Sequence, residues 1–283
     1  MNKLTTAKKV AVISALVEGC SVRSTCRLTG VAKGTVLRLL ADVGDACARY
    51  QDAVIRHVPA RRVQVDEIWS FVGCKQKNVT ATIAANNPKA GDAWTFVAID
   101  AQTKLVLSWL VALRDAGSAT EFLRDVSDRL SNRIQLTTDG HKMYLSAVED
   151  AFGGDIDYSM LIKLYGSASD GQTRYSPAKC LGCVPQPVTG DPDPKHVSTS
   201  YIERQNLTMR MNMRRFTRLT NAFSKKIENH MHSVALFYMH YNFVRVHQTL
   251  RVTPAMEAGI AMTVWSIQNI VELAEPASQT EAA

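Results

Sequence analysis

Three carboxylates stand where each could bind a metal ion, and each belongs to a different expected element of structure. Asp66 interrupts an apolar strand pattern, Asp139 directly follows another apolar run, and Glu203 lies in a helical stretch. An acid inside a strand is costly to bury unless it is paired or bound to a cation. Divalent ions such as Mg²⁺ take oxygen ligands, and a pair of them can activate the attacking oxygen and stabilise the leaving oxygen of a phosphodiester. The three acids therefore suggest a two-metal site for phosphoryl transfer.

The neighbouring acid Glu67 competes with Asp66 for this role. Successive side chains of a strand point to opposite faces, so we assign the ligand to Asp66 and expect Glu67 to face away. Helical spacing puts Glu203, Asn206 and Arg210 on one face, where a metal ligand, an amide and a phosphate-binding guanidinium would point the same way. The alternative for Glu203 is an ordinary solvated acid.

The elements that must position these acids follow from the period of the apolar residues. Strands are expected at 63–71, 94–99, 105–113, 134–138 and 156–164, with helices at 118–130 and 142–151 between the later strands. This order predicts an α/β fold in which a mixed sheet carries helices on its faces. Residues 166–195, rich in Gly and Pro, are expected to form a loop or lid. A long helix should run from about 198 past Arg218, and another from 223 to 241.

The N-terminal residues predict a helix-turn-helix. Helices are expected at 6–18, 22–28 and 33–40, with a turn at 29–31 between the second and third. The helix after such a turn enters the major groove, which would present Lys33, Thr35 and Arg38 to DNA. A plain three-helix bundle without DNA is the alternative. The expected domains are the helix-turn-helix at 1–45, a linker or helix at 46–60, a catalytic domain at 61–258, and a C-terminal helix and tail at 259–283.

The charge of the chain favours a polyanionic partner. Its 33 Lys and Arg residues outnumber 26 Asp and Glu residues, for a formal net charge of +7. No acid interrupts the stretch 204–226, where a phosphate backbone could lie, although a solvated helix face would look the same. From this stretch and its helix we expect DNA contacts by Arg204, Asn206, Arg210, Arg214 and Arg215.

Four phrases of the sequence resemble a known group of proteins. They are VDEIWSFVG around Asp66, TTDGHKMY around Asp139, YIERQNLTMRMNMRR around Glu203, and YNFVRVHQTLRVTPA at 241–255. The first three together resemble the insertion-sequence-one family of transposases. The fourth is similar to the segment that follows the catalytic glutamate in many transposases and retroviral-type integrases.

The resemblance implies a ribonuclease-H-like catalytic core with a metal-binding DDE triad formed by Asp66, Asp139 and Glu203. It also implies two Mg²⁺ ions, with Mn²⁺ as a substitute, and cleavage and strand transfer at the terminal inverted repeats of a mobile element. Water and then a 3'-hydroxyl would be the nucleophiles. The expected partners are the terminal repeats, target DNA, and further copies of the chain in a dimer or larger assembly on DNA.

Two other functions compete with this hypothesis. The chain could be a helix-turn-helix regulator whose second domain is inactive, or a ribonuclease or resolvase with the same core. The intact acids disfavour the first, and the N-terminal helices disfavour the second. Covalent recombinase chemistry is disfavoured because Tyr201 and Tyr241 are not accompanied by the Arg-His-Arg residues that this chemistry needs.

The remaining metal-binding residue types give weaker signals. Cys180 and Cys183 form a CxxC that, with His196, could be half of a zinc site, but no second pair completes it. We expect the six cysteines to be reduced thiols. Four histidines are expected to be satisfied mostly by packing, with His247 a possible contact to DNA; they are His230, His232, His240 and His247. Because the chain shows neither a membrane-spanning run nor a signal peptide, we expect it to be cytoplasmic and nucleoid-associated.

Overall fold

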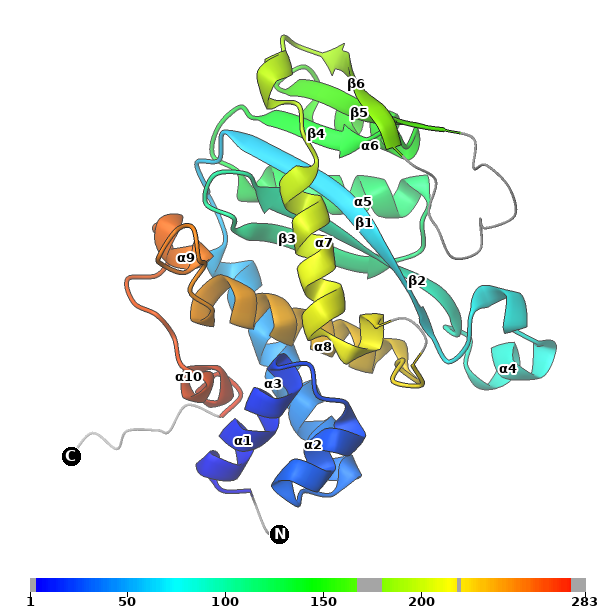
Figure 1. Ribbon diagram of the computed structural model, residues 1–283, viewed down its shortest axis with the longest axis vertical. Helices are drawn as coiled ribbons and strands as arrows, with labels where there is room; N and C mark the ends of the chain where they lie inside the picture. The colour runs from blue at the N-terminus through cyan, green and yellow to red at the C-terminus, as the bar shows by residue number, and fades with distance from the viewer. Residues whose placement is uncertain (1–3, 167–179, 218–219, 276–283) are drawn as a thin grey trace.

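The computed structural model describes residues 4–166, 180–217 and 220–275. Its centre is a six-stranded mixed sheet (Figure 1) in the order β3-β2-β1-β4-β5-β6. The strands are β1 (Arg62–Val72), β2 (Gly91–Asp100), β3 (Val106–Ala112), β4 (Gln135–Asp139), β5 (Asp157–Tyr165) and β6 (Cys180–Thr189). β1 pairs antiparallel with β2 and β2 with β3, whereas β4 lies parallel to both β1 and β5. This topology confirms the predicted α/β, ribonuclease-H-like mixed sheet.

Helices cover both faces of the sheet (Figure 1). The helices α5 (Ala116–Arg129) and α6 (Met143–Phe152) lie on one face, and α7 (Ser200–Asn212) and α8 (Ile227–Met239) on the other. The alternation along β1 explains this division, because Val63 and Val65 pack toward α5 and α6 while Ile68 and Val72 pack toward α7 and α8. Even-numbered residues of β1, Asp66 among them, therefore face α7.

The N-terminal helices share a core with the rest of the chain. α1 (Thr6–Val17) and α2 (Val22–Thr29) precede α3 (Lys33–Val54), a single helix that runs through the expected boundary at residue 45. α3 packs closely on α8, where a Cβ added to Gly44 would lie 2.5 Å from the Cβ of His232. The Gln51 amide also donates to the Ala235 carbonyl at 3.1 Å. The segment 46–60, predicted as a linker or helix, therefore begins as part of α3.

The expected loop at 166–195 is wrong for residues 180–189, which form the edge strand β6; residues 167–179 of that loop lie outside the described residues. β6 pairs antiparallel with β5, and Pro185 and Pro187 stand opposite Leu161 and Ser159. Prolines at positions i and i+2 of a strand direct their nitrogens to the same side. Both can therefore face the free edge of the sheet, where no backbone N–H is needed for pairing. Pro content alone could not distinguish a loop from an edge strand.

The two helices expected after the sheet differ from the expectation in length. α7 ends at Asn212 instead of continuing past Arg218, because Met213 takes an extended backbone before a 3-10 turn at Arg214–Phe216. α8 continues into a π-helical turn at His240–Val244. Further short elements are a 3-10 turn at Gln76–Asn78, α4 (Ala81–Asn86), a 3-10 turn at Pro194–His196, α9 (Pro254–Glu257) and α10 (Ile267–Glu272). The expected tail from residue 276 on lies outside the described residues.

Candidate metal centre

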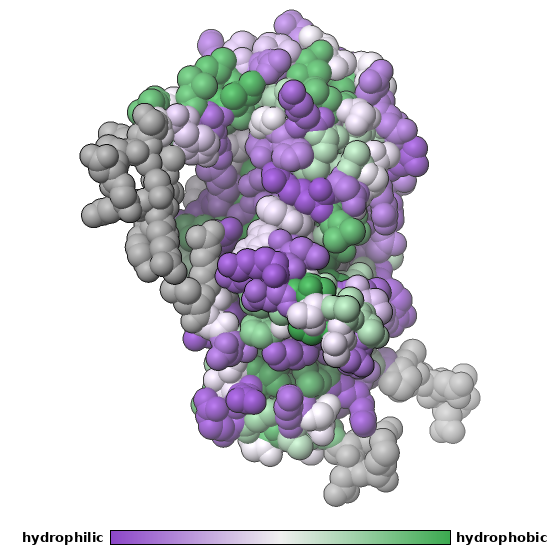
Figure 2. All heavy atoms as spheres, turned by 90° about the vertical axis from the view of Figure 1, so that its right-hand side faces the viewer, coloured by the Kyte–Doolittle hydropathy of each residue, from purple (hydrophilic) through white to green (hydrophobic). Residues whose placement is uncertain are grey.

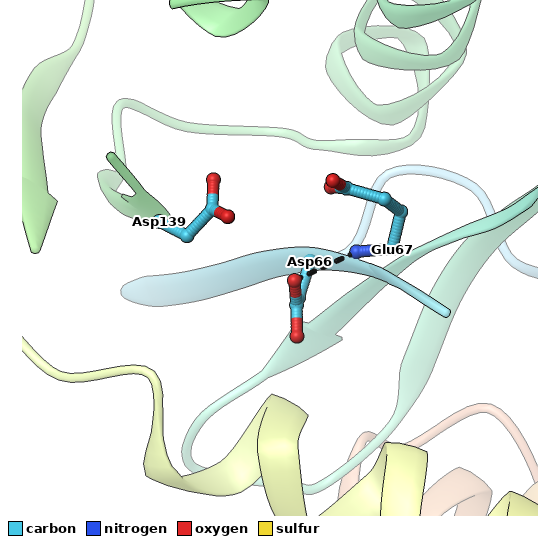
Figure 3. A group of neighbouring side chains, drawn as sticks. All are labelled: Asp66, Glu67 and Asp139. Atoms are coloured by element: carbon cyan, nitrogen blue, oxygen red, sulfur yellow. Dashed lines mark hydrogen bonds between the residues drawn. The ribbon is translucent and has the colours of Figure 1, made fainter. Parts of the chain in front are cut away.

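Three acids converge where β1 and β4 separate (Figure 3). One carboxylate oxygen each of Asp66, Glu67 and Asp139 lies within 4.8 Å of the other two. β1 and β4 pair in register only as far as Gln64 and Thr137, and the same register extended by two places sets Asp66 opposite Asp139. Beyond the last paired residues the gap between the strands admits side chains from both. The structure thus brings together two of the three predicted ligands and adds Glu67.

Asp66 points toward α7, whereas Glu67 and Asp139 lie on the other side of β1 (Figure 3). The Asn206 side chain on α7 donates to Asp66 Oδ2 at 2.9 Å, and the backbone N–H of Glu67 donates to Oδ1 at 2.9 Å. Burial, together with the charges of Glu67 and Asp139, raises the pKa of Asp66 to about 7. A buried acid whose ionisation is opposed by two further acids is a site that a cation would stabilise.

Glu67 does face away from α7, as predicted, but its carboxylate is held beside the cluster. Arg114 Nε donates to Glu67 Oε1 at 2.6 Å, and the Tyr144 hydroxyl donates to Oε2 at 2.5 Å. Only 1% of the Glu67 side chain is exposed, and the Arg114 guanidinium lies 4.6 Å from the ring centroid of Trp94. These partners neutralise Glu67 and fix its position. The sequence interpretation missed this role, although an Arg just after a strand was a usable signal.

Glu203 lies in the first turn of α7 and is held by Lys163 of β5. The Lys163 Nζ atom is 2.6 Å from Glu203 Oε1. Partial burial opposes ionisation of Glu203, but the hydrogen bonds and charge of Lys163, with a hydrogen bond from Thr199, lower its pKa. The positive charge of Lys163 also acts on Asp66. Glu203 is therefore linked to the acid cluster through Lys163 and is not one of its three members.

Gln64 positions α7 over the cluster. Its side-chain oxygen accepts from the backbone N–H groups of Tyr201 at 2.9 Å and Ile202 at 3.1 Å, so a buried residue of β1 satisfies donors at the start of α7. Since Asp66 lies two residues farther along the same strand, β1 carries both the first acid and the anchor of the helix that bears Glu203. Neither Gln64 nor Lys163 was singled out in the sequence. A Lys inside the apolar strand β5 was the clearer signal.

The predicted DNA-contacting residues lie in two places. Lys33 and Arg38 are exposed on α3 and Thr35 is half-buried, after a turn in which Gly30 takes a left-handed φ of 69°. In the second group, Arg204 and Arg214 are exposed, Asn206 is buried against Asp66, and Arg210 is half-buried. Arg215 is also partly buried: it donates to the Ser224 hydroxyl at 2.6 Å, and burial lowers its pKa to about 10.

The cysteines and histidines are not grouped as a metal site among the described residues. All six cysteines are free, with Cys180 and Cys183 exposed on β6, and His196 contacts Arg62 instead of them. His230 is fully buried between the hydroxyls of Ser70 and Ser224, each at 3.1 Å, so its predicted packing role is confirmed. The Nδ1 atom of His247 is buried without a hydrogen-bond partner among the described residues, and its expected contact to DNA stays a prediction.

Comparisons with known proteins give weak likenesses to transposases. No protein-family profile and no curated protein sequence matches the chain. A piggyBac transposase synaptic complex with hairpin DNA is similar at 10% identity and a TM-score of 0.45, over 95% of this chain and 69% of that one. The Mos1 strand transfer complex is similar at 17% identity and a TM-score of 0.23, over 54% and 56%. The fold assignment therefore rests on the chain's own sheet topology.

No helix in the described parts of the chain has both the length and the apolar character needed to span a membrane.

Proposed function

We propose that this protein is a DDE transposase of the insertion-sequence type, which cleaves DNA at the inverted repeats of a mobile element and joins the ends to target DNA. The observation that carries the proposal is the convergence of Asp66 and Asp139 at the gap between β1 and β4, under a helix that bears Glu203. The transposase-like phrases in the sequence surround these same three acids.

The residues of the site fit divalent metal ions. The donors are carboxylate oxygens, which Mg²⁺ and Mn²⁺ prefer, and burial together with the charges of Glu67 and Asp139 raises the pKa of Asp66, so that a cation would stabilise its carboxylate. We assign the ions to Asp66, Asp139 and Glu203, with Glu67 beside them. When bound, two such ions would supply activation of the attacking oxygen and stabilisation of the leaving oxygen.

The chain's own side chains orient this site. Asn206 holds the Asp66 carboxylate from α7, and Arg114 with Tyr144 holds Glu67 from the opposite face. In this proposal Arg204, exposed next to Glu203, would bind a DNA phosphate. In the proposal water attacks first and a 3'-hydroxyl second, so no side chain forms a covalent intermediate. Further copies of the chain would assemble on paired DNA ends.

The test is cleavage of a plasmid that carries the DNA flanking the gene. We expect wild type to cut it in Mg²⁺ or Mn²⁺. Asp66→Asn, Asp139→Asn and Glu203→Gln should each lose at least about 100-fold in rate, because each removes a carboxylate that holds the charge-stabilising ions at the reaction centre. Asp128→Asn is the matched control, since Asp128 is an exposed acid on α5. If the three variants cleave like Asp128→Asn, the site is not catalytic. If wild type binds the flanking DNA and never cleaves it, a DNA-binding regulator is the better description.

A further inference from the structure

A second polar feature lies between the N-terminal helices and the segment that follows α7. It is a groove of about 660 Å³, called here the basic groove. One wall comes from the start of α2 and α3, with Arg23 and Lys33, and the other from residues 214–215 and 220–229, with Arg214, Lys225 and Lys226. None of its lining residues is acidic. The groove therefore differs from the metal centre both in the sign of its charge and in the elements that form it.

The cations of the basic groove are available to a ligand. Arg23, Lys33, Arg214, Lys225 and Lys226 are all exposed, and none forms an ion pair with any acid in the described parts of the chain. The nearby acid Glu228 lies outside the lining, 3.5 Å from Lys89. Figure 2 shows hydrophilic side chains over much of one face of the molecule, with hydrophobic patches near its top and between them. These properties favour a polyanion over an apolar partner.

The N-terminus of α3 adds to this positive potential. α2, α3 and α8 all begin at the groove, where Val22, Lys33 and Lys226 belong to its lining. The N-cap residue of α3 is Ala32, which provides no side-chain acceptor for the first backbone N–H groups. In contrast, Ser21 caps α2, and Glu228 in the first turn of α8 accepts from a backbone N–H. Unsatisfied N–H groups and the helix dipole both favour an anion at such an end. The groove thus combines side-chain cations with backbone donors.

The walls of the groove are fixed relative to the catalytic sheet. The Ser224 carbonyl accepts from the Gly73 backbone N–H at 2.8 Å, at the end of β1. The Ser224 hydroxyl accepts from Arg215 at 2.6 Å and contacts the buried His230. The opposite wall is held by the close packing of α3 on α8. A charged site on rigid elements loses less conformational entropy when it binds a ligand, because its backbone is already ordered.

We propose that the basic groove binds the sugar–phosphate backbone of duplex DNA beside the N-terminus of α3. Several cations spread along an open groove suit a repeating charge better than a single phosphate, and Lys33 belongs both to the groove and to the helix expected to read bases. The groove would thereby join the recognition helix to the catalytic sheet on one DNA. This inference rests on the proposed function for its choice of DNA as the ligand.

The experiment measures binding of the full chain to a fluorescein-labelled, random-sequence DNA duplex by anisotropy over a range of salt concentrations. We expect Lys225→Ala/Lys226→Ala to weaken binding and to reduce the slope of log K against log salt by about 2, because each phosphate contact contributes roughly 0.9. The control is Arg49→Ala/Arg124→Ala, which removes the same charge from exposed ion pairs on α3 and α5, outside the groove. Its slope should equal that of wild type.

Two outcomes would overturn the inference. Equal slopes for the two double variants would show that the groove does not contact phosphates. If the wild-type protein still cleaved the flanking-DNA plasmid, the proposed function would stand without a DNA-binding groove. Duplex RNA of the same sequence binding as tightly as DNA, with the same dependence on Lys225 and Lys226, would make RNA the ligand. Binding by Asp66→Asn with the wild-type slope would support a groove that acts independently of the metal centre.

Discussion

The metal centre and the basic groove each gather charges of one sign, but they do so in different surroundings. At the metal centre Glu67 is buried and Asp66 and Asp139 are half-buried, and burial with repulsion from the other two acids raises the pKa of Asp66 to about 7. In the groove the cations are exposed, and water and salt screen them. Buried like charges reduce stability until a specific ion binds, whereas exposed ones cost little and attract an extended polyanion. Clustered like charges thus indicate a metal ion at the first site and an extended polyanion at the second.

The largest effect expected from breaking this contrast is a gain of stability in Asp66→Asn without divalent ions. Because the folded pKa of Asp66 lies above its ordinary value of 3.8, wild type is stabilised below pH 4 and loses that contribution as the pH rises through about 7. Asn does not titrate, so at pH 8 in EDTA the variant should gain up to about 4 kcal/mol over wild type, judged at about 1.4 kcal/mol per pKa unit. Urea unfolding at pH 4 and pH 8 measures this. A pH-independent difference would mean that Asp66 is not repelled in the folded protein.

The adjacent substitution Glu67→Gln should have the opposite sign. Its carboxylate is buried but paired with Arg114 and Tyr144, so loss of the charge weakens two hydrogen bonds and leaves the guanidinium without its partner. We expect a loss of about 2 to 3 kcal/mol in the same unfolding measurement. A Glu67→Gln protein more stable than wild type would show that repulsion from Asp66 outweighs these partners.

A change away from both charged regions tests whether the groove's walls are held together by packing. In Gly44→Ala the added Cβ would lie 2.5 Å from the Cβ of His232 and 2.6 Å from its carbonyl oxygen, so α3 and α8 must separate. We expect a net loss of about 1 to 3 kcal/mol and weaker DNA binding. Gly34→Ala is the matched control for stability, since nothing lies within 4 Å of its added Cβ. Equal stability of the two variants would argue against tight packing at Gly44.

The smallest effect on stability is expected in the groove itself. Lys225→Ala/Lys226→Ala removes two exposed cations that pair with no described acid, so the free energy of unfolding should stay within about 0.5 kcal/mol of wild type. Lys225 lies 3.7 Å from the ring centroid of Phe223, which is its one ring contact among the described residues. Thermal unfolding provides the measurement, and a loss of several kcal/mol would mean that these lysines are part of the fold.

Local patterns predicted strands β1 to β5 and the elements that carry Asp66 and Asp139, because both depend on short-range periodicity. The alternation in β1 correctly separated Asp66 from Glu67, and the apolar run before Asp139 marked a strand end. Sequence patterns did not show that β1 and β4 separate beyond Gln64, which lets Glu67 approach the cluster from the other face. Contacts between distant elements, such as Lys163 with Glu203, depend on strand order and leave no local signal.

The N-terminal region shows the same limit. The helices and their turn were predicted, but the length of α3 was not: the expected helix ended at residue 40, whereas α3 continues through Gly44, a point of close packing on α8. The expected helix-turn-helix domain at 1–45 and its boundary stay a prediction, but the apolar face of α3 does not pack on the N-terminal helices alone. That face is instead completed by residues of α8, including Ala235, Leu236 and Met239.

The central claim is that the acids at the gap between β1 and β4 bind divalent ions, and calorimetric titration with Mn²⁺ tests it most directly. Wild type should bind Mn²⁺, and Asp66→Asn and Asp139→Asn should each weaken that binding by more than the roughly 10- to 100-fold typical of residues that only support a ligand. Asp128→Asn should bind like wild type. Equal Mn²⁺ binding by wild type and both cluster variants would contradict the account, because the ions would then be held elsewhere.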